Sequence, residues 1–247
     1  MTLTRRNLLQ LSGAAALGSA LPGVAGAAPG DEPPAPIAVL KPMTAGMTPI
    51  GLEERQARLA RARRLLAESG LDAMVIAGGS SLGYFTGAQW GNSERFFGVI
   101  VTREGDPVWV TPAFEKDRAL QQIKVGSDVR AWEEDASPYA AVAQVLKDRK
   151  ASGRVGIEET MPFVFADGIG KALPATRLKS ATPVTAGCRM VKDAHELALM
   201  RRACEITVAA HRAVFASLKE GMTQSEVARL ASEAHRRSGI AGGSLVL

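Results

Sequence analysis

The chain has 247 residues, of which 46% are hydrophobic and 22% charged, as is ordinary for a soluble globular protein. Its length allows two domains, of which one and a fraction would be complete. The formal net charge of +5, two units of which come from Arg5 and Arg6, is too small to indicate a nucleic-acid partner.

The first 27 residues have the features of an export signal. Thr4-Arg5-Arg6-Asn7-Leu8-Leu9 is a twin-arginine pattern, residues 8–21 are weakly apolar, and Ala25-Gly26-Ala27 suits cleavage after Ala27. We predict a signal peptide for the twin-arginine export machinery and a periplasmic or secreted mature protein. The alternatives are an uncleaved anchor or a chance basic pair, but the apolar stretch is too short for a confident membrane span, so no stable membrane association is expected.

A proline- and alanine-rich stretch and a basic helix follow. Residues 28–50 contain Pro33-Pro34 and Pro36 and predict a flexible linker. Residues 53–69 predict an amphipathic helix that Gly70 ends, and its five arginines are interpreted as a solvated face.

A glycine-rich loop follows the buried strand predicted at 73–77. Gly78-Gly79-Ser80-Ser81-Leu82-Gly83 has neither dinucleotide-binding nor P-loop spacing, and no lysine follows it. A turn into the next helix is therefore favoured over a phosphate cradle.

The middle of the chain alternates strands and helices, which predicts an α/β domain with a mixed sheet and flanking helices. A Tyr84-Phe85-Thr86-Gly87 turn precedes a hairpin of strands at 96–102 and 107–110. Further strands are expected at 128–131 and 154–157, and helices at 114–123 and 138–150. A helix ending over 168–173 and a last strand or linker at 178–184 complete this part.

Residues 191–247 predict two helices and the beginning of a strand. Leu199, Ala203, Ile206, Ala210, Val214 and Leu218 line one helix face, and Gly221 is expected to end that helix. Thr223 and Glu226 form a capping box for the second helix, and residues 244–247 begin an apolar strand. Because a chain rarely ends in mid-strand with an unpaired edge, we expect an incomplete polypeptide or one that ends where its relatives continue.

The thiols and imidazoles provide no recognisable site. We expect Cys204, near the apolar helix face, to be a buried free thiol, and a disulfide with Cys188 is not favoured. His195 and His211 lie 16 residues apart on one helix, about 24 Å along its axis, and cannot share a metal ion. His235 stands apart from any metal-ligand spacing.

Two strings in the C-terminal part resemble a known family. K-D-A-H-E-L-A-L-M-R-R-A and E-G-M-T-Q-S-E-V, within 190–247, are similar to the opening of the catalytic domain of the creatinase/prolidase/aminopeptidase P family. A looser resemblance to its N-terminal domain covers 52–185. The resemblance implies a creatinase-like N-terminal domain over 51–187, followed at 188–247 by the first two helices and first strand of an incomplete pita-bread α+β domain.

The resemblance also implies a function. The family hydrolyses peptide bonds next to proline, using two divalent metal ions (Mn, Co or Zn), and its five metal ligands would lie beyond the hairpin that Leu247 begins. We therefore expect a homodimeric Xaa-Pro dipeptidase or aminopeptidase acting on small peptides, present here as a portion that binds no metal and is inactive by itself. The alternative is a non-catalytic binding or dimerisation module of the same fold.

The segment Trp90-Gly91-Asn92-Ser93-Glu94-Arg95 is the best substrate-binding candidate. It is interpreted as a polar loop with an exposed tryptophan, and Arg95 falls where creatinase carries an arginine that contacts the substrate carboxylate. The resemblance implies that Arg95 and Trp90 bind peptide in the neighbouring subunit's active site, which suits a guanidinium. A surface salt bridge from Arg95 to Glu94 or a nearby acid is equally compatible with the sequence.

The acidic clusters favour structural roles. Glu158-Glu159 and Glu133-Glu134-Asp135 follow strands without a nearby histidine or lysine, so solvated turns are expected. Asp193 and Glu196 are expected to stabilise a helix N-terminus rather than bind a metal. No catalytic residue is assigned in the sequence.

Overall fold

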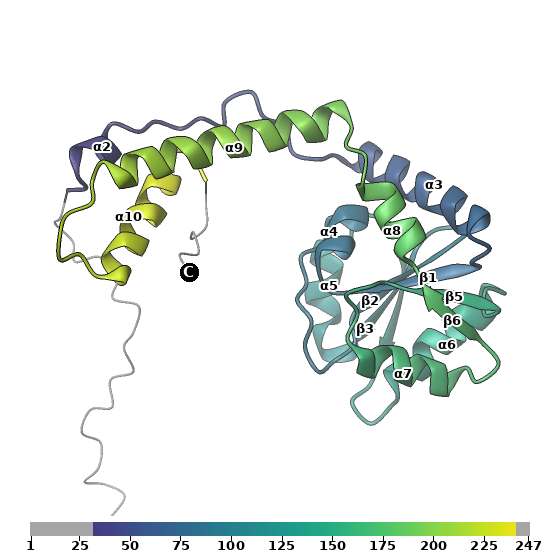
Figure 1. Cartoon of the computed structure of the whole chain (residues 1–247). Coiled ribbons are helices and arrows are strands. Elements are labelled where there is room, and N and C mark those ends of the chain that lie inside the picture. Colours follow the sequence, from purple (N-terminus) through teal and green to yellow (C-terminus); the bar gives the residue numbers. More distant parts are fainter. Residues whose placement is uncertain (1–31, 241–247) are drawn as a thin grey trace, which may run out of the picture. The chain divides into compact units, whose positions relative to one another are not determined.

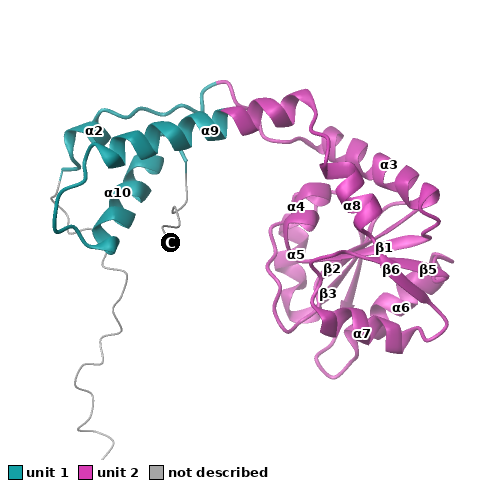
Figure 2. Ribbon diagram, viewed as in Figure 1, with its two compact units in different colours: residues 1–45, 202–247 teal, residues 46–201 magenta. Residues whose placement is uncertain are grey.

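The computed structural model describes residues 32–240, which form two compact units (Figures 1 and 2). One unit contains residues 46–201, and the other contains the described parts of 1–45 and 202–247. The predicted signal peptide, Ala27 and the strand at 244–247 lie outside the described residues. Among those that are described, no helix is both long and apolar enough to cross a membrane.

A six-stranded mixed sheet organises the unit of residues 46–201, with strand order β4-β3-β2-β1-β5-β6. The central strand β1 pairs antiparallel with β2 and parallel with β5, while the edge strands β4 and β6 pair parallel with their neighbours. The strand bounds are Ala73–Ala77 (β1), Gly98–Thr102 (β2), Val108–Pro112 (β3), Asp128–Trp132 (β4), Arg154–Ile157 (β5) and Arg177–Ser180 (β6).

Helices cover both faces of the sheet, because its central strands carry apolar residues on both sides. The helices of one face are α3 (Leu52–Glu68), α4 (Ser80–Thr86), α5 (Lys116–Gln122, after a 3-10 turn at Ala113–Glu115) and α8 (Thr182–Arg189). Those of the other face are α6 (Pro138–Asp148) and α7 (Phe163–Ala172). The predicted mixed α/β fold is therefore confirmed.

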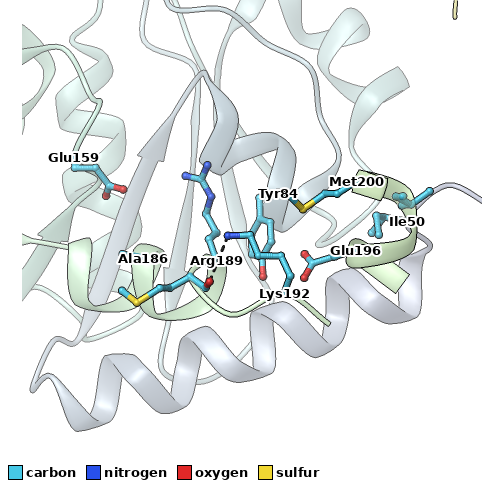
Figure 3. Close-up of a pocket in the computed structure, with 10 residues that line it drawn as sticks. Ile50, Tyr84, Glu159, Ala186, Arg189, Lys192, Glu196 and Met200 are labelled. Atoms are coloured by element: carbon cyan, nitrogen blue, oxygen red, sulfur yellow. Dashed lines mark hydrogen bonds between the residues drawn. The ribbon is translucent and has the colours of Figure 1, made fainter. Parts of the chain in front are cut away.

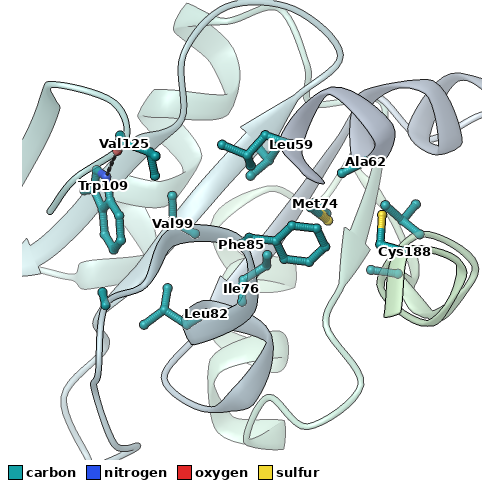
Figure 4. Packing of buried hydrophobic residues seen from close by; sticks show 14 of the residues in the cluster. Leu59, Ala62, Met74, Ile76, Leu82, Phe85, Val99, Trp109, Val125 and Cys188 are labelled. Atoms are coloured by element: carbon teal, nitrogen blue, oxygen red, sulfur yellow. Dashed lines mark hydrogen bonds between the residues drawn. The ribbon is translucent and has the colours of Figure 1, made fainter. Parts of the chain in front are cut away.

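The sheet core on the α3 side is built around two large aromatic side chains (Figure 4). Phe85 of α4 and Trp109 of β3 are both fully buried. The Trp109 indole N–H donates to the carbonyl of Val125 at 2.9 Å, which satisfies its one polar atom. Met74 and Ile76 alternate with Ala73, Val75 and Ala77 along β1, and the two sets enter opposite cores.

The expectation of a last strand or linker at 178–184 is wrong in its second half. Strand β6 ends at Ser180, and Thr182 begins the helix α8. Pro183 occupies the first turn of this helix, where its missing N–H costs nothing, and Val184 and Cys188 are buried one turn apart.

The other unit is a helical hairpin with an N-terminal segment packed on it. It contains α2 (Ala35–Ala38), α10 (Gln224–Arg237) and α9 (Ala194–Phe215) from residue 202 onward. Ile37 of α2 is fully buried against Ala210 and Val214. Arg237 donates to the carbonyl of Ala38 at 3.0 Å. The predicted linker at 28–50 therefore contains a short helix, α2, that packs on the helical hairpin through the buried Ile37. In this part the segment differs from the flexible tether that the sequence predicted.

Two expectations about α9 require correction. The helix ends at Phe215, and Gly221, at φ +85°, serves in the turn before α10. Cys204 is exposed, whereas Cys188 is the buried thiol. The predicted capping box of α10 is present, since Thr223 Oγ1 accepts from the Glu226 N–H and Glu226 accepts from the Thr223 N–H.

Candidate functional site

The loop between α4 and β2 holds the tryptophan that the sequence singled out. Trp90 is only 8% exposed, so the interpretation of an exposed side chain is wrong. Its ring stacks on Phe97 with centroids 3.9 Å apart, and the Arg118 guanidinium carbon lies 4.0 Å from the ring centroid. Trp90 therefore fixes the loop by packing rather than by presenting its ring to solvent.

A close backbone approach holds the same loop against the end of β1. The Gly79 N–H donates to the Trp90 carbonyl at 2.9 Å. A Cβ on Gly78 would lie 2.7 Å from that oxygen, so no side chain fits there. The glycine-rich segment thus leads into α4, as predicted, and its first glycine allows the loop to pass.

Arg95 lies on the surface of this loop and forms ion pairs. Its Nη2 lies 2.8 Å from Glu134 Oε1, and it also pairs with Glu94. The hydrogen bond to Glu134 is the main cause that raises the pKa of Arg95. The guanidinium carbon lies 5.2 Å from the centroid of the Phe114 ring, and Phe114 is 61% exposed. Arg95 therefore forms the surface salt bridges that the sequence allowed as the alternative to a substrate contact.

The two glutamates that follow β5, Glu158 and Glu159, differ in their exposure to solvent. Glu158 is 2% exposed, and its carboxylate accepts from the hydroxyls of Ser81 and Thr160, each at 2.7 Å. The prediction of a solvated turn is therefore wrong for Glu158, because α4 supplies a buried donor. Glu159 is exposed, as are Glu133, Glu134 and Asp135, which agrees with the prediction for those four residues.

The first turn of α9 is tied to α3 by two ion pairs. Glu196 pairs with Arg58 at 2.6 Å, and His195 Nδ1 lies 2.6 Å from Glu54 Oε1. The hydrogen bond to Glu54 is the main cause that raises the pKa of His195. Asp193 and Glu196 also accept from each other's backbone N–H, which agrees with their predicted role in stabilising the N-terminus of this helix.

Two of the five arginines of α3 are structural, in contrast to the solvated face that the sequence predicted, whereas Arg64 is exposed. Arg55 donates to the carbonyl of Gly83, and Arg58 to that of Tyr84. The Arg58 guanidinium carbon also lies 4.0 Å from the Tyr84 ring centroid. These contacts use guanidinium groups to hold α4 against α3.

A cavity of about 520 Å³ opens beside Tyr84 within the unit of residues 46–201 (Figure 3). Both charged and apolar side chains line it: Ile50, Tyr84, Glu159, Ala186, Arg189, Met190, Lys192, Glu196, Leu199 and Met200. Its volume falls within the range of about 300–1,000 Å³ that small-molecule sites occupy. No residue type in the sequence had indicated this cavity, because its lining comes from five separate segments.

Residues 32–240 do not fit a dinuclear metal centre. No three His, Cys, Asp or Glu side chains converge in this range to hold an ion. His195 and Glu196, the side chains with suitable chemistry, are engaged with Glu54 and Arg58. No hydrolytic step through a metal can therefore be assigned to these residues.

Comparison with known proteins identifies the relatives. Residues 58–191 match the Creatinase/Prolidase N-terminal domain, and residues 198–245 match Metallopeptidase family M24. An uncharacterised peptidase of Schizosaccharomyces pombe is 32% identical over 72% of this chain and 41% of its own length. The probable dipeptidase PepE of Mycobacterium tuberculosis is 31% identical over 72% of this chain and 47% of its own length.

Solved structures agree with the sequence matches. Dipeptidase PepE from Mycobacterium ulcerans superposes with a TM-score of 0.67 at 27% identity, over 78% of this chain and 52% of that one. A prolidase from Thermococcus sibiricus gives a TM-score of 0.69 at 22% identity over the same shares, which supports the fold alone. The chain thus spans about half the length of the relatives it matches.

Proposed function

Because the chain belongs to the creatinase/prolidase family, we propose that it supplies the N-terminal domain and opening helices of an M24-type metal-dependent hydrolase that cleaves small peptides next to proline. The observation that carries this proposal is the order of the two matches, at 58–191 and 198–245, in one chain. The name of one relative, a probable dipeptidase, supports a small-peptide substrate.

These 247 residues are proposed to be inactive by themselves, because the described residues lack a metal-binding group. In a complete enzyme of this type, two divalent ions would activate water for attack on the peptide carbonyl. The contribution of this chain would then be to bind and orient the peptide.

Arg95 is the residue proposed to contact the peptide, by holding its terminal carboxylate in the active site of a neighbouring subunit. Its guanidinium is surface-exposed, and a peptide carboxylate would replace the one that Glu134 now provides. Trp90 is buried, so its proposed role is to position the loop that carries Arg95.

A hybrid enzyme tests these proposals. Residues 28–240 of this chain would replace the corresponding part of the Mycobacterium tuberculosis dipeptidase, and proline release from an Ala-Pro dipeptide would be measured with Mn²⁺, Co²⁺ or Zn²⁺. We expect hydrolysis by the hybrid and none by the 247-residue chain. A folded, metal-loaded hybrid that leaves Ala-Pro intact would refute the peptidase assignment, and turnover by the chain alone would refute its inactivity.

The Arg95→Ala variant of the hybrid isolates the substrate role. Loss of one charged contact predicts a KM at least about tenfold higher, equivalent to about 1.4 kcal/mol. Arg177→Ala is the matched control, because Arg177 is exposed on the edge strand β6. An Arg95→Ala KM equal to that of the control would exclude the contact.

Two exposed apolar side chains in the segment after β3 favour a second role in dimerisation. Phe114 and Leu120 are both exposed, and Phe114 lies under the Arg95 guanidinium. A second copy covering this patch would remove apolar surface from water. Sedimentation analysis should show a dimer that a Phe114→Glu/Leu120→Glu variant converts to a monomer, and a monomeric parent chain would argue against it.

Export through the twin-arginine machinery is proposed from Arg5, Arg6 and the small residues before Ala27. Residues 1–27 fused to a reporter that folds in the cytoplasm should direct it to the periplasm, and an Arg5→Lys/Arg6→Lys variant should retain it inside. Equal export of the two fusions would contradict this route.

A further inference from the structure

The charges that line the cavity beside Tyr84 do not balance one another. Of its two carboxylates, Glu196 is neutralised by Arg58 at 2.6 Å and also accepts the Asp193 N–H at 3.0 Å. Glu159 accepts the Thr185 hydroxyl at 2.6 Å, and among residues 32–240 it forms no salt bridge of 4.0 Å or less.

The two cations of the cavity have weaker partners. Arg189 Nη1 donates to the Ser81 hydroxyl at 3.2 Å, and Lys192 donates to the Met190 carbonyl at 3.4 Å. Within the part of the chain that the structure describes, Arg189 and Lys192 form no salt bridge of 4.0 Å or less. When Glu196 is counted with its partner Arg58, the remaining charges of the lining are two positive, Arg189 and Lys192, and one negative, Glu159. The cavity therefore has one excess positive charge.

Apolar side chains form the rest of the lining. They include Ile50, which precedes α3, and Leu199 and Met200 of α9. Figure 3 shows Lys192, Tyr84, Glu196 and Met200 gathered together, with Glu159 apart from them. The Tyr84 hydroxyl already donates to the Cys188 carbonyl at 3.0 Å, so its ring offers mainly an apolar surface.

From this arrangement we propose that the cavity binds a small organic monoanion, a carboxylate held by Arg189 and Lys192 with its apolar body against Leu199 and Met200. A guanidinium and an ammonium together suit a carboxylate group, and the single excess charge matches a monoanion. The methionine and leucine side chains accommodate apolar bodies of varied shape. This site is independent of the hydrolysis proposed above and requires no metal.

Calorimetric titration of the full chain tests the proposal with a matched pair of probes, N-acetyl-leucine and its neutral amide. The acid should bind with a Kd on the order of 1 mM, as expected for a small ligand with two charged contacts, and the amide at least about tenfold more weakly. Salt should weaken the binding of the acid, because the recognition is electrostatic.

Three variants locate the site. Lys192→Gln and Arg189→Gln should each weaken binding of the acid by about tenfold. Arg189→Gln also removes a hydrogen bond to Ser81 and could therefore affect folding. Lys192 is exposed, so the Lys192→Gln variant should keep the fold and tests the site by itself. Lys116→Gln, at an exposed position on α5, removes the same charge elsewhere and should leave the Kd unchanged.

Methyl-labelled methionine provides a second measurement in the same sample. N-acetyl-leucine should shift the NMR signal of Met200, which lines the cavity, and leave that of Met74, in the sheet core, unchanged. Equal affinity for acid and amide, or a Lys192→Gln variant that binds like Lys116→Gln, would overturn the proposal. So would saturable binding that leaves the Met200 signal unmoved.

Discussion

Gly98 is a position in the middle of the sheet where a single added methyl group would meet the backbone of a neighbouring strand. It begins β2 and pairs with Ala77 of β1 and Val110 of β3, in the middle of the sheet. A Cβ there would lie 2.5 Å from the Ile76 carbonyl oxygen, about 0.9 Å inside ordinary contact, and 2.9 Å from the Phe96 ring. The obstacle is backbone, which cannot rotate away as a flexible side chain does.

The expected cost of Gly98→Ala follows from this overlap. Overpacking a core costs about 1–3 kcal/mol, and a backbone clash between paired strands places this variant at the upper limit. For a protein of this size, about 3 kcal/mol corresponds to a Tm lower by roughly 6–12 °C. The change would also displace the loop that carries Arg95, because Gly98 follows it directly.

Thermal melting followed by circular dichroism measures this effect, with Gly91→Ala as the matched control. Gly91 undergoes the same chemical change, but nothing lies within 4 Å of its added Cβ. The control should stay within about 0.5 kcal/mol of the parent chain. If Gly98→Ala melts at the temperature of Gly91→Ala, strand spacing is not the constraint that the geometry indicates.

Three further predictions concern thiols, a helix cap and pH. Burial raises the pKa of the Cys188 thiol, whereas Cys204 is exposed, so a thiol reagent should label one cysteine in the native chain and two in denaturant. Two labelled thiols before unfolding would contradict this burial. Thr223→Ala removes the cap of α10 and should cost about 1 kcal/mol in urea unfolding, whereas Thr223→Ser should retain most of it. The hydrogen bond with Glu54 raises the pKa of His195, so the pair's contribution to stability is complete below the unfolded value of about 6.5 and is lost as pH rises through the folded value. The pKa of Glu54 is lowered, chiefly by the Gly51 N–H, so the contribution is also lost as pH falls below about 4.3 and through the folded value. The Tm difference between the parent chain and His195→Gln should therefore peak near pH 5–6, and a difference that does not vary with pH would refute this role.

Local patterns predicted the elements that depend on local chemistry. The apolar run 73–77 gave β1 with its observed bounds, and the Thr223–Glu226 spacing gave the start of α10. In each case the signal lies within a few residues of the structure that it specifies.

Side chains whose surroundings are set by distant segments could not be predicted in this way. Glu158 is buried because Ser81, 77 residues earlier, donates to it, and Trp90 because Phe97 and Arg118 cover its ring. Loop composition suggested solvent for both of these residues, since charge and polarity report local preference and not long-range packing.

Helical periodicity alone was also insufficient for Cys204. The buried face of α9 in its unit is centred on Ile206 and Ala210, where α2 and α10 pack. Cys204 lies two residues before Ile206, a rotation of about 200° around the helix axis, and therefore faces away. The periodicity of the sequence located an apolar face on α9, but it did not show which residues of that face α2 and α10 cover.

The position of the domain boundary is explained by the two ion pairs between α3 and α9. The family matches end at 191 and resume at 198, yet the sheet unit extends to residue 201, in the second turn of α9. Arg58–Glu196 and Glu54–His195 join this first part of α9 to the sheet domain, and the hydrogen-bonded backbone of the helix continues without a break to Phe215. The interval between the creatinase-type match and the M24 match, residues 192–197, therefore contains the start of a continuous helix. For the same reason, a hybrid joined between 191 and 198 would separate Arg58 and Glu54 from their own partners, whereas one joined after α9 keeps both pairs.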